Sequence, residues 1–239
     1  MRRRTYYPEH KSRKFLKRWI FLGVPLLFLS FVAVCSLFFS MRVLHTEAMA
    51  PNLLAGDRLI FSTYKFIKYL PWTSLDKRPL PFSRGHVVLV DMFNEEEHEL
   101  LYSVMDGVLR FVSAQRISLI EQRENIFIKR IIGLPGDEIT MTNYLVRVRA
   151  KDSAFSLTEF ELTEQRYTTS IPQASITWDS SLPFSGDMDR IVLGDNEFFL
   201  LSDDRSNTND SRTWGPVTIN NISGRALFRY WPFTRLGRP

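Results

Sequence analysis

The stretch Ile126-Phe127-Ile128-Lys129-Arg130-Ile131-Ile132-Gly133-Leu134-Pro135-Gly136-Asp137 decides how this chain is organised. Its first seven residues are mostly β-branched or aromatic, which is typical of a strand, and the glycines, proline and aspartate that follow end it. Side chains alternate between the two faces of a strand, so Lys129 points away from Ile128. We therefore predict a strand over 126–132 in which one lysine stands among aliphatic and aromatic neighbours.

Further short strands are predicted on both sides of this stretch, and together they indicate a mainly β fold. Between 95 and 120 apolar residues recur at helical spacing, which predicts an amphipathic helical insertion. Packing of that helix on the core and contact with a membrane both remain open. The other predicted strands cover 58–61, 86–90, 144–149, 198–201 and 226–230.

Lys129 is a candidate general base. If its face of the strand is apolar, loss of hydration disfavours the ammonium and lowers the lysine pKa toward neutrality. Such an amine can take the proton of a nearby serine without any histidine. The histidines at 10, 45, 86 and 98 have neither metal-ligand nor triad spacing. We therefore expect lysine chemistry that needs no metal and no cofactor.

The N-terminal region has the pattern of a membrane anchor. Residues 1–18 carry eight Arg or Lys against Glu9 alone, and Trp19 to Met41 follow as 23 residues without a charge. Such a length crosses a bilayer as a helix, and basic flanks stay in the cytoplasm. A cleaved signal peptide is the alternative, but its apolar core would be shorter, roughly 7–15 residues, and would end at a small-x-small site.

These observations predict a single-pass protein of the cell (inner or cytoplasmic) membrane with its N-terminus in the cytoplasm. A basic tail at 1–18 precedes a transmembrane helix at 19–41. An antiparallel β domain at 42–239 lies on the outer face, with a core at 42–140 and 195–239 and a second β lobe at 141–194.

The composition narrows the possible partners. The tail carries +7, so the net charge of +5 minus +7 leaves −2 for the other 221 residues, which argues against nucleic acid binding. Cys35 is the only cysteine, so no disulfide forms within the chain, and a small apolar role is favoured over a lipid attachment point. The aromatic and basic stretch at 64–72 fits a membrane interface or a loop packed on its own sheet.

Several blocks resemble the bacterial type I signal peptidases, which are Ser-Lys serine endopeptidases. The most characteristic is Lys129-Arg130 followed by the turn at 133–137. Residues 47–57 (EAMAPNLLAGD) resemble the nucleophile box, which reads Ser-Met-x-Pro-Thr-Leu and then Gly-Asp. The remaining matches are 84–88 (RGHVV), 202–215 (SDDRSNTNDSRTWG), Gly224-Arg225-Ala226 and Trp231-Pro232.

The resemblance implies a catalytic role for four positions. Ala48 occupies the position of the nucleophile, and Lys129 would be the general base. Thr208, where the family has serine, would hydrogen-bond and orient the lysine. Thr46 would complete an oxyanion hole together with the backbone N–H of position 48.

The resemblance also implies how the site is held and how a substrate binds. Asp210 and Arg212 would form a structural ion pair beside the site. An extended substrate would add as a β-strand between 42–46 and 126–128. The residues implied for substrate binding are Leu44, Met49, Ile126, Phe127 and Ile128.

Position 48 is the departure with the largest chemical consequence, because a methyl group cannot attack a carbonyl. The change is either natural, as in a pseudoprotease, or an engineered serine-to-alanine substitution. Attack by Thr46 instead is disfavoured, since that side chain would serve the oxyanion. Further positions that differ from the family pattern are Glu47, Asn52, Ser202 and Asp204, where the family has glycine, threonine, glycine and asparagine.

The resemblance therefore implies a membrane-anchored signal peptidase that cleaves N-terminal signal peptides of exported proteins, with those peptides and the lipid bilayer as partners. With Ala48 as written we expect no cleavage. The alternative is a pseudoprotease that binds signal peptides, or that partners an active paralogue, without cutting.

Overall fold

The computed structural model describes residues 9–63, 82–92, 105–109, 113, 117, 126–151, 153–172 and 179–239. The chain divides into two compact units, Met1–Leu37 with Glu99–Ile120, and Phe38–His98 with Glu121–Pro239. Of the helical insertion predicted at 95–120, residues 105–109 are helical, and most of the rest lies outside the described residues. The predicted stretch at 64–72 and the start of the basic tail also lie outside them.

Helix α1 (Glu9–Phe38) is the long helix of the first unit and contains Pro25. It differs from the predicted helix at 19–41 at both ends. It begins within the basic segment, and Phe39, Ser40 and Met41 belong to the strand that follows. In the part of the chain that the structure describes, no helix combines the length and the apolar character that a membrane crossing requires.

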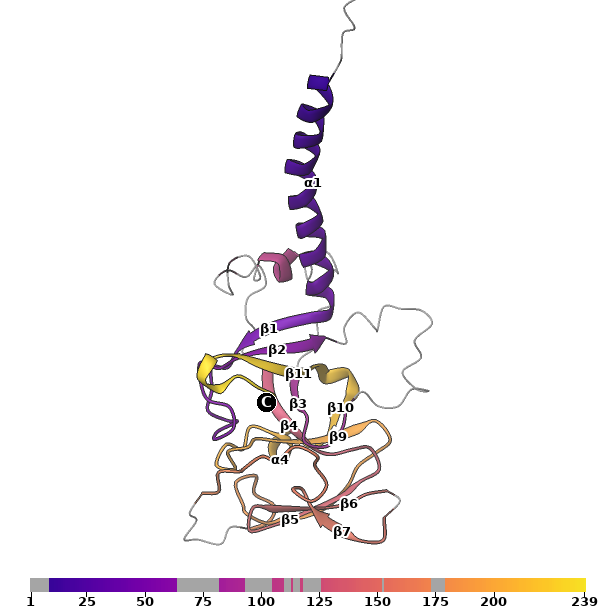
Figure 1. The fold of residues 1–239 in the computed structure, drawn as a ribbon. Helices are drawn as coiled ribbons and strands as arrows, with labels where there is room; N and C mark the ends of the chain where they lie inside the picture. The colour runs from indigo at the N-terminus through magenta and orange to yellow at the C-terminus, as the bar shows by residue number, and fades with distance from the viewer. Residues whose placement is uncertain are drawn as a thin grey trace, which may run out of the picture. The chain divides into compact units, whose positions relative to one another are not determined.

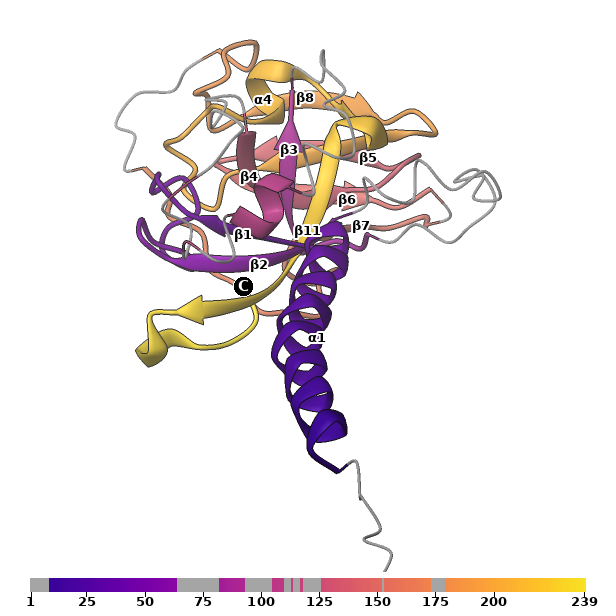
Figure 2. The same ribbon diagram turned by 90° about the horizontal axis from the view of Figure 1, so that it is seen from above.

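The second unit is built on a seven-stranded sheet in which neighbouring strands run antiparallel (Figure 1). Strand β3 lies between β11 and β4, near the middle of this sheet (Figure 2). All five residues of β3 are buried. From one edge to the other the strands are β1 (Phe39–Val43), β2 (Arg58–Thr63), β11 (Ile222–Trp231), β3 (Val87–Asp91), β4 (Ile126–Gly133), β9 (Glu197–Leu201) and β10 (Val217–Thr218).

Strand β4 has different neighbours along its length. On one side, all of 126–130 pairs with β3. On the other side, pairing with β9 begins only at Arg130, which lies opposite Leu201. Residues 126–129 therefore pair with β3 on one side and are not paired with β9 on the other.

A four-stranded antiparallel sheet forms the second lobe, in the order β7 (Ser156–Thr158), β6 (Leu145–Arg149), β5 (Glu138–Thr142) and β8 (Met188–Val192). Strands β5 and β6 alternate between buried and more exposed residues, which is the pattern of a sheet with one face on a core. The predicted boundary between 140 and 141 falls inside β5, so this lobe begins earlier than predicted.

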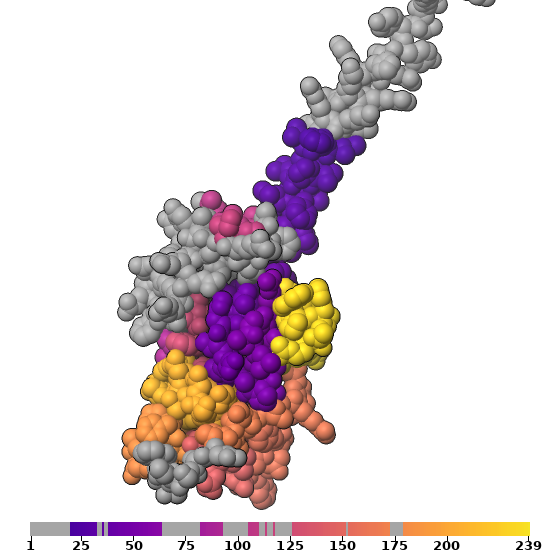
Figure 3. Space-filling view, turned by 90° about the vertical axis from the view of Figure 1, so that its left-hand side faces the viewer, coloured from indigo at the N-terminus to yellow at the C-terminus, as the bar shows by residue number. Residues whose placement is uncertain are grey.

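Short helical segments and the C-terminus complete this unit. They are α4 (Ser211–Trp214), η2 (Ile219–Asn221) and η3 (Phe233–Arg235). In the space-filling view the C-terminal residues lie against the surface of the segment around β1 and β2 (Figure 3). Two arginines hold them there, because Arg235 and Arg229 both bind the buried carboxylate of Asp57, at 2.6 and 3.3 Å.

A glycine is required at one position where β11 pairs with β2. Gly224 pairs with Thr63, and a Cβ placed at Gly224 would lie 2.4 Å from the carbonyl oxygen of Ser62. No side chain fits at that distance from backbone. The close approach lets β11 pair with β2 on one side and β3 on the other, which brings the C-terminal strand into the middle of the sheet.

The prediction of a mainly β, antiparallel fold is confirmed. Six predicted strands correspond to β2, β3, β4, β6, β9 and β11, with ends that differ by up to four residues. The strand edge implied at 42–46 overlaps β1, which runs from Phe39 to Val43. Strands β5, β7, β8 and β10 were not among the predicted strands.

Candidate active site

Three segments that are distant in sequence meet at the candidate site: the turn that contains Ala48, the middle of β4, and the loop that begins at Ser202. The backbone N–H of Asp204 donates to the carbonyl oxygen of Ala48 at 3.0 Å. Lys129 donates from Nζ to Ser202 Oγ at 2.7 Å. The next residue of each pair, Arg130 and Asp203, forms an ion pair. These contacts bring the blocks noted in the sequence to one place.

Lys129 is buried, with only 2% of its surface exposed. Its strand is surrounded by apolar residues on both sides, and its ammonium lies 5.7 Å from the ring centre of Trp214. Burial lowers the pKa of Lys129 from 10.5 to about 8, while the carboxylate of Asp210 opposes the shift. A lysine with a pKa near 8 is partly neutral at physiological pH, which a general base requires.

The hydroxyl bonded to Lys129 is that of Ser202, at the end of β9, rather than that of Thr208. Ser202 is fully buried, and its Oγ also lies 3.4 Å from Oδ1 of Asn207. Thr208 is half-buried, and its carbonyl oxygen accepts hydrogen bonds from Asp210 and Thr213. Among the described residues its side chain makes no hydrogen bond to Lys129, so the role implied for Thr208 stays a prediction.

Asp210 and Arg212 form a buried ion pair that shapes the loop from 202 to 212. The Asp210 carboxylate accepts from Nε and Nη2 of Arg212 at 2.9 and 2.8 Å, and from the backbone N–H of Ser202 at 3.0 Å. Arg212 also donates to the carbonyl oxygens of Arg205 and Asn207. Burial raises the pKa of Asp210, but the hydrogen bonds and charge of Arg212 outweigh it and hold that pKa below its usual range.

Arg130 and Asp203 connect β4 to this loop. Arg130 donates from Nε and Nη2 to the two carboxylate oxygens of Asp203, and its guanidinium lies 4.2 Å from the ring centre of Tyr167. Tyr167 belongs to the segment after β7 and donates its hydroxyl to Glu159 at 2.7 Å. The charged layer under the site is therefore shared between the two sheets of this unit.

Asn52 ties the turn that contains Ala48 to the same charged layer. Its Nδ2 donates to Asp203 Oδ2 at 2.8 Å and to the carbonyl oxygen of Thr168 at 2.6 Å. Its Oδ1 accepts from the backbone N–H of Thr168 at 3.2 Å. The asparagine that replaces the family's threonine at position 52 therefore joins the first block, the last block and the second lobe.

The predicted oxyanion side of the site is open to solvent. Thr46 and Glu47 are exposed and lie in a bend after β1 ends at Val43, whereas Ala48 is buried. The predicted stretch 42–46 is therefore a strand only as far as Val43. The structure places Thr46 next to the Ala48 turn in the chain but records no hydrogen bond of its side chain to another described residue.

The residues implied for substrate binding separate into two groups. Leu44 and Met49 are buried in one apolar cluster, and Ile126 and Ile128 pack against it. Phe127 points to the other face of β4, where its ring lies 4.9 Å from that of Trp214. Four of the five predicted residues thus share one cluster, and Phe127 lies with Lys129 beside the tryptophan.

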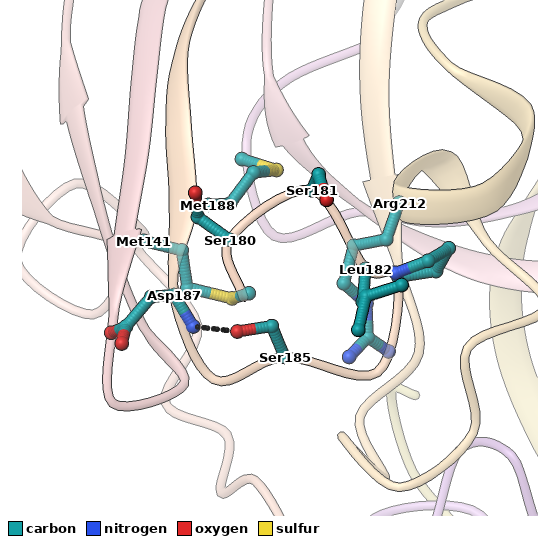
Figure 4. Close-up of a pocket in the computed structure, with 9 residues that line it drawn as sticks. Met141, Ser180, Ser181, Leu182, Ser185, Asp187, Met188 and Arg212 are labelled. Atoms are coloured by element: carbon teal, nitrogen blue, oxygen red, sulfur yellow. Dashed lines mark hydrogen bonds between the residues drawn. The ribbon is translucent and has the colours of Figure 1, made fainter. Parts of the chain in front are cut away.

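A small pocket opens on the second lobe, and Lys129 is not among the residues that line it. It lies between β5, the loop before β8 and the side chain of Arg212 (Figure 4). The guanidinium of Arg212 is held by Asp210 and two carbonyl oxygens. The residues that line the pocket are Met141, Ser180, Ser181, Leu182, Pro183, Ser185, Asp187, Met188 and Arg212.

Ser202, Asp203 and Asn52 are the residues at this site to which sequence reasoning gave no role. Ser202 and Asn52 stood out only as departures from a family pattern. Ser202 contacts Lys129 across 73 positions of the chain, and Asn52 contacts Asp203 across 151. No local spacing in the sequence reveals pairs so far apart. Asp203 is the second residue after the buried strand β9, and this position is the single local signal that could have marked it.

The candidate site thus combines a buried lysine of lowered pKa, an ion-paired loop beside it and a stretch of strand edge that is not paired with β9. The class of protein comes from comparison with known families: residues 16–231 match the family described as signal peptidase, peptidase S26. The chain therefore belongs to the signal peptidase family S26. It is 26% identical to signal peptidase I of Streptococcus pneumoniae over 94% of this chain and 97% of that protein.

Two further relatives are also signal peptidases I. The chain is 32% identical to signal peptidase I of Leptolyngbya laminosa, over 82% of this chain and 70% of that protein. It is 36% identical to signal peptidase I of Bacillus caldolyticus, over 45% of this chain and 54% of that protein.

Proposed function

We propose that this protein is a signal peptidase I whose lysine machinery is assembled for cutting the signal peptides of exported proteins, but which does not cut as written because position 48 is alanine. The single observation that carries the proposal is Lys129: it is buried, hydrogen-bonded to a serine, and its pKa is lowered to about 8. Burying an amine in this way opposes folding, so the arrangement favours a catalytic over a structural role.

The position of Ala48 supports its assignment to the nucleophile. The carbonyl oxygen of Ala48 accepts a hydrogen bond from the backbone N–H of Asp204. Two residues earlier in the same loop, Ser202 accepts a hydrogen bond from Lys129. A serine at position 48 would add its hydroxyl in this neighbourhood. In the proposed reaction Lys129 takes the proton of that hydroxyl as the oxygen attacks the peptide carbonyl, and then passes it to the leaving amine. Backbone N–H groups near 48, with Thr46, would stabilise the oxyanion.

The edges of two strands support binding of an extended peptide. Strand β1 is at the edge of the sheet, and residues 126–129 of β4 have no partner in β9. A peptide that adds there would run past the cluster of Leu44, Met49, Ile126 and Ile128. Apolar walls so closely packed favour small side chains before the cut, in agreement with signal peptide substrates.

The test is cleavage of a preprotein in detergent by the full chain and by Ala48→Ser. We expect no cleavage by the parent, and a gain of about 10³-fold or more from the added hydroxyl. Ala50→Ser adds the same atom two residues away and should gain nothing, and Ala48→Ser combined with Lys129→Met should be inactive. Cleavage by the unmodified chain, or by the Lys129→Met double variant, would contradict the assignments.

Membrane attachment is a further part of the proposal, and it rests on the sequence. Residues 19–41 carry no charge, and a segment of +7 precedes them. We expect the protein to remain in the membrane fraction after alkaline carbonate extraction, with the β domain accessible to protease from the outer face. Release by carbonate would exclude an integral anchor.

Binding without cleavage is the second candidate, favoured by the buried methyl group of Ala48. It predicts that the parent chain binds a labelled small-x-small peptide, and that a peptide with arginine at both small positions binds much less. If Ala48→Ser does not cut although the peptide binds, the pseudoprotease function, alone or beside an active paralogue, is the one supported.

A further inference from the structure

The hydroxyl of Ser202 has contacts that belong to a functional site rather than to packing alone. Its Oγ accepts from Lys129 Nζ at 2.7 Å and lies 3.4 Å from Oδ1 of Asn207. A hydroxyl has one proton to donate and two lone pairs. With its proton directed to Asn207, its lone pairs face the amine.

The backbone of Ser202 is fixed independently of its side chain. Its N–H donates to Asp210 Oδ2, and that carboxylate is held by Arg212. The residue stands at the end of β9, directly after Leu201, which pairs with Arg130 of β4. The hydroxyl is thus positioned relative to Lys129 by a strand pairing on one side and an ion pair on the other.

Lys129 has this one hydrogen bond among the described residues. An ammonium carries three N–H donors, and a fully buried one costs free energy for each donor without an acceptor. Ser202 is therefore the hydrogen-bond acceptor that holds Nζ in place, whereas burial is the largest cause of the lowered pKa of Lys129. Thr208 bonds elsewhere through its carbonyl oxygen and does not share this contact.

We propose that Ser202 is a positioning residue that orients the amine of Lys129, so that the lysine-orienting hydroxyl of this chain comes from position 202 and not from position 208. The inference rests on the proposed function for its catalytic consequence, but not for the contact itself. It explains two departures together: a serine replaces the family's glycine at 202, and threonine replaces serine at 208.

The first test needs no activity. In the full chain in detergent, the lysine Cε signal is followed by NMR as pH is raised, with Lys129→Met used to assign it. Ser202→Ala removes the one acceptor that Lys129 has among the described residues, so the charged amine is less stable and the pKa of Lys129 should fall further below 8. Ser202→Cys keeps the shape with a weaker acceptor and should give a smaller fall in the same direction.

Matched variants decide between the two hydroxyls. Thr208→Val and the exposed Ser206→Ala should leave the titration of Lys129 within about 0.3 unit of the parent, since a change of that size is under 0.5 kcal/mol. A fall with Thr208→Val, or an unchanged titration in both Ser202 variants, would overturn the proposal. The Thr208→Val titration can still overturn the proposal even if Ser202→Ala fails to fold.

The second test uses Ala48→Ser as the background. A misplaced general base should lower kcat by about 10- to 100-fold with KM within about twofold, because proton transfer and not binding is affected. Ser202→Ala should show this pattern, and the exposed control Ser206→Ala should not. If Ala48→Ser itself is inactive, the proposed function fails while the NMR titration still tests the role of Ser202.

Discussion

Arg130 and Asp203 form a bidentate ion pair in which each side chain is 1% exposed, with N–O distances of 2.7 and 2.6 Å. The pair lies one residue from Lys129 and one from Ser202, so it sets the distance between the strand that carries the lysine and the loop that faces it. Loss of one partner would leave the other charge buried without compensation.

Asp203→Asn should therefore lower the free energy of unfolding by about 3–5 kcal/mol. The measurement is unfolding by heat or urea in detergent, followed by tryptophan fluorescence. Asp195→Asn is the matched control, since Asp195 is 91% exposed and pairs with Lys151 at 3.3 Å. Removing that surface pair should cost under about 1 kcal/mol. Equal effects of the two changes would contradict the importance of burial.

Lys129→Met should stabilise the protein at pH 7. Burial lowers the pKa of Lys129 from 10.5 to about 8, so the folded state binds this proton less tightly than the unfolded chain. Below pH 8 both states are protonated and the full penalty, of the order of 3 kcal/mol, opposes folding. Between pH 8 and 10.5 the folded state loses the proton first and the parent gains stability with pH.

The advantage of Lys129→Met should accordingly shrink as pH rises from 8 toward 10. Unfolding curves of both proteins at pH 7, 8, 9 and 9.5 measure it. A constant difference across that range would mean that Lys129 does not titrate near 8.

Cleavage by Ala48→Ser should follow the neutral form of Lys129. Because the pKa is about 8, kcat/KM should rise about tenfold per pH unit at lower pH and level off above 8. The profile is measured with a preprotein whose own charge is constant between pH 6 and 9. A plateau that already begins at pH 6.5 would contradict a lysine base.

Glu47→Gln in the Ala48→Ser background should raise kcat by a few-fold. The carboxylate is exposed and adjacent to the position where the oxyanion forms, so its repulsion is screened by water and stays small. The gain should diminish as salt is increased from 20 to 500 mM. Glu164→Gln, which lies outside the blocks of the site, serves as the control and should have no effect.

Asn52→Ala should loosen the connection between the Ala48 turn and the second lobe. Four hydrogen bonds to Asp203 and Thr168 are lost, for about 1–3 kcal/mol, as Asp203 and the Thr168 backbone lose partners. Limited proteolysis should then cut near 160–172 faster than in the parent. Asn52→Asp should be worse than alanine, because it places a second carboxylate against Asp203.

Much of the second unit could be predicted from local patterns. The runs that form β3, β4 and β9 are rich in β-branched, aromatic or leucine side chains and apolar enough to be predicted as strands. The start of strand β1 was not predicted because Phe39, Ser40 and Met41 continue an uncharged segment, and only pairing with β2 makes them a strand. Strand β8, Met-Asp-Arg-Ile-Val, has two charged residues and depends on β5 for its conformation.

At the site, the burial of Lys129 followed from its neighbours in the strand, since alternation and apolar content are local. The partner of its amine did not. Position 202 looked like an altered start of a block, and only the pairing of β9 with β4 brings its hydroxyl to the lysine. Roles taken from resemblance name a residue type at a position, whereas a hydrogen bond depends on a few tenths of an ångström in three dimensions.

The uneven pairing of β4 has a consequence for where a bound peptide must stop. A strand added beside 126–129 can extend no further along β4 than Lys129, because β9 occupies the edge from Arg130 on. Lys129 is the last open position before this barrier. The end of a bound peptide strand would then have a fixed position on β4. The peptide bond that faces Lys129 would depend on the number of residues between that end and the bond, as well as on the side chains.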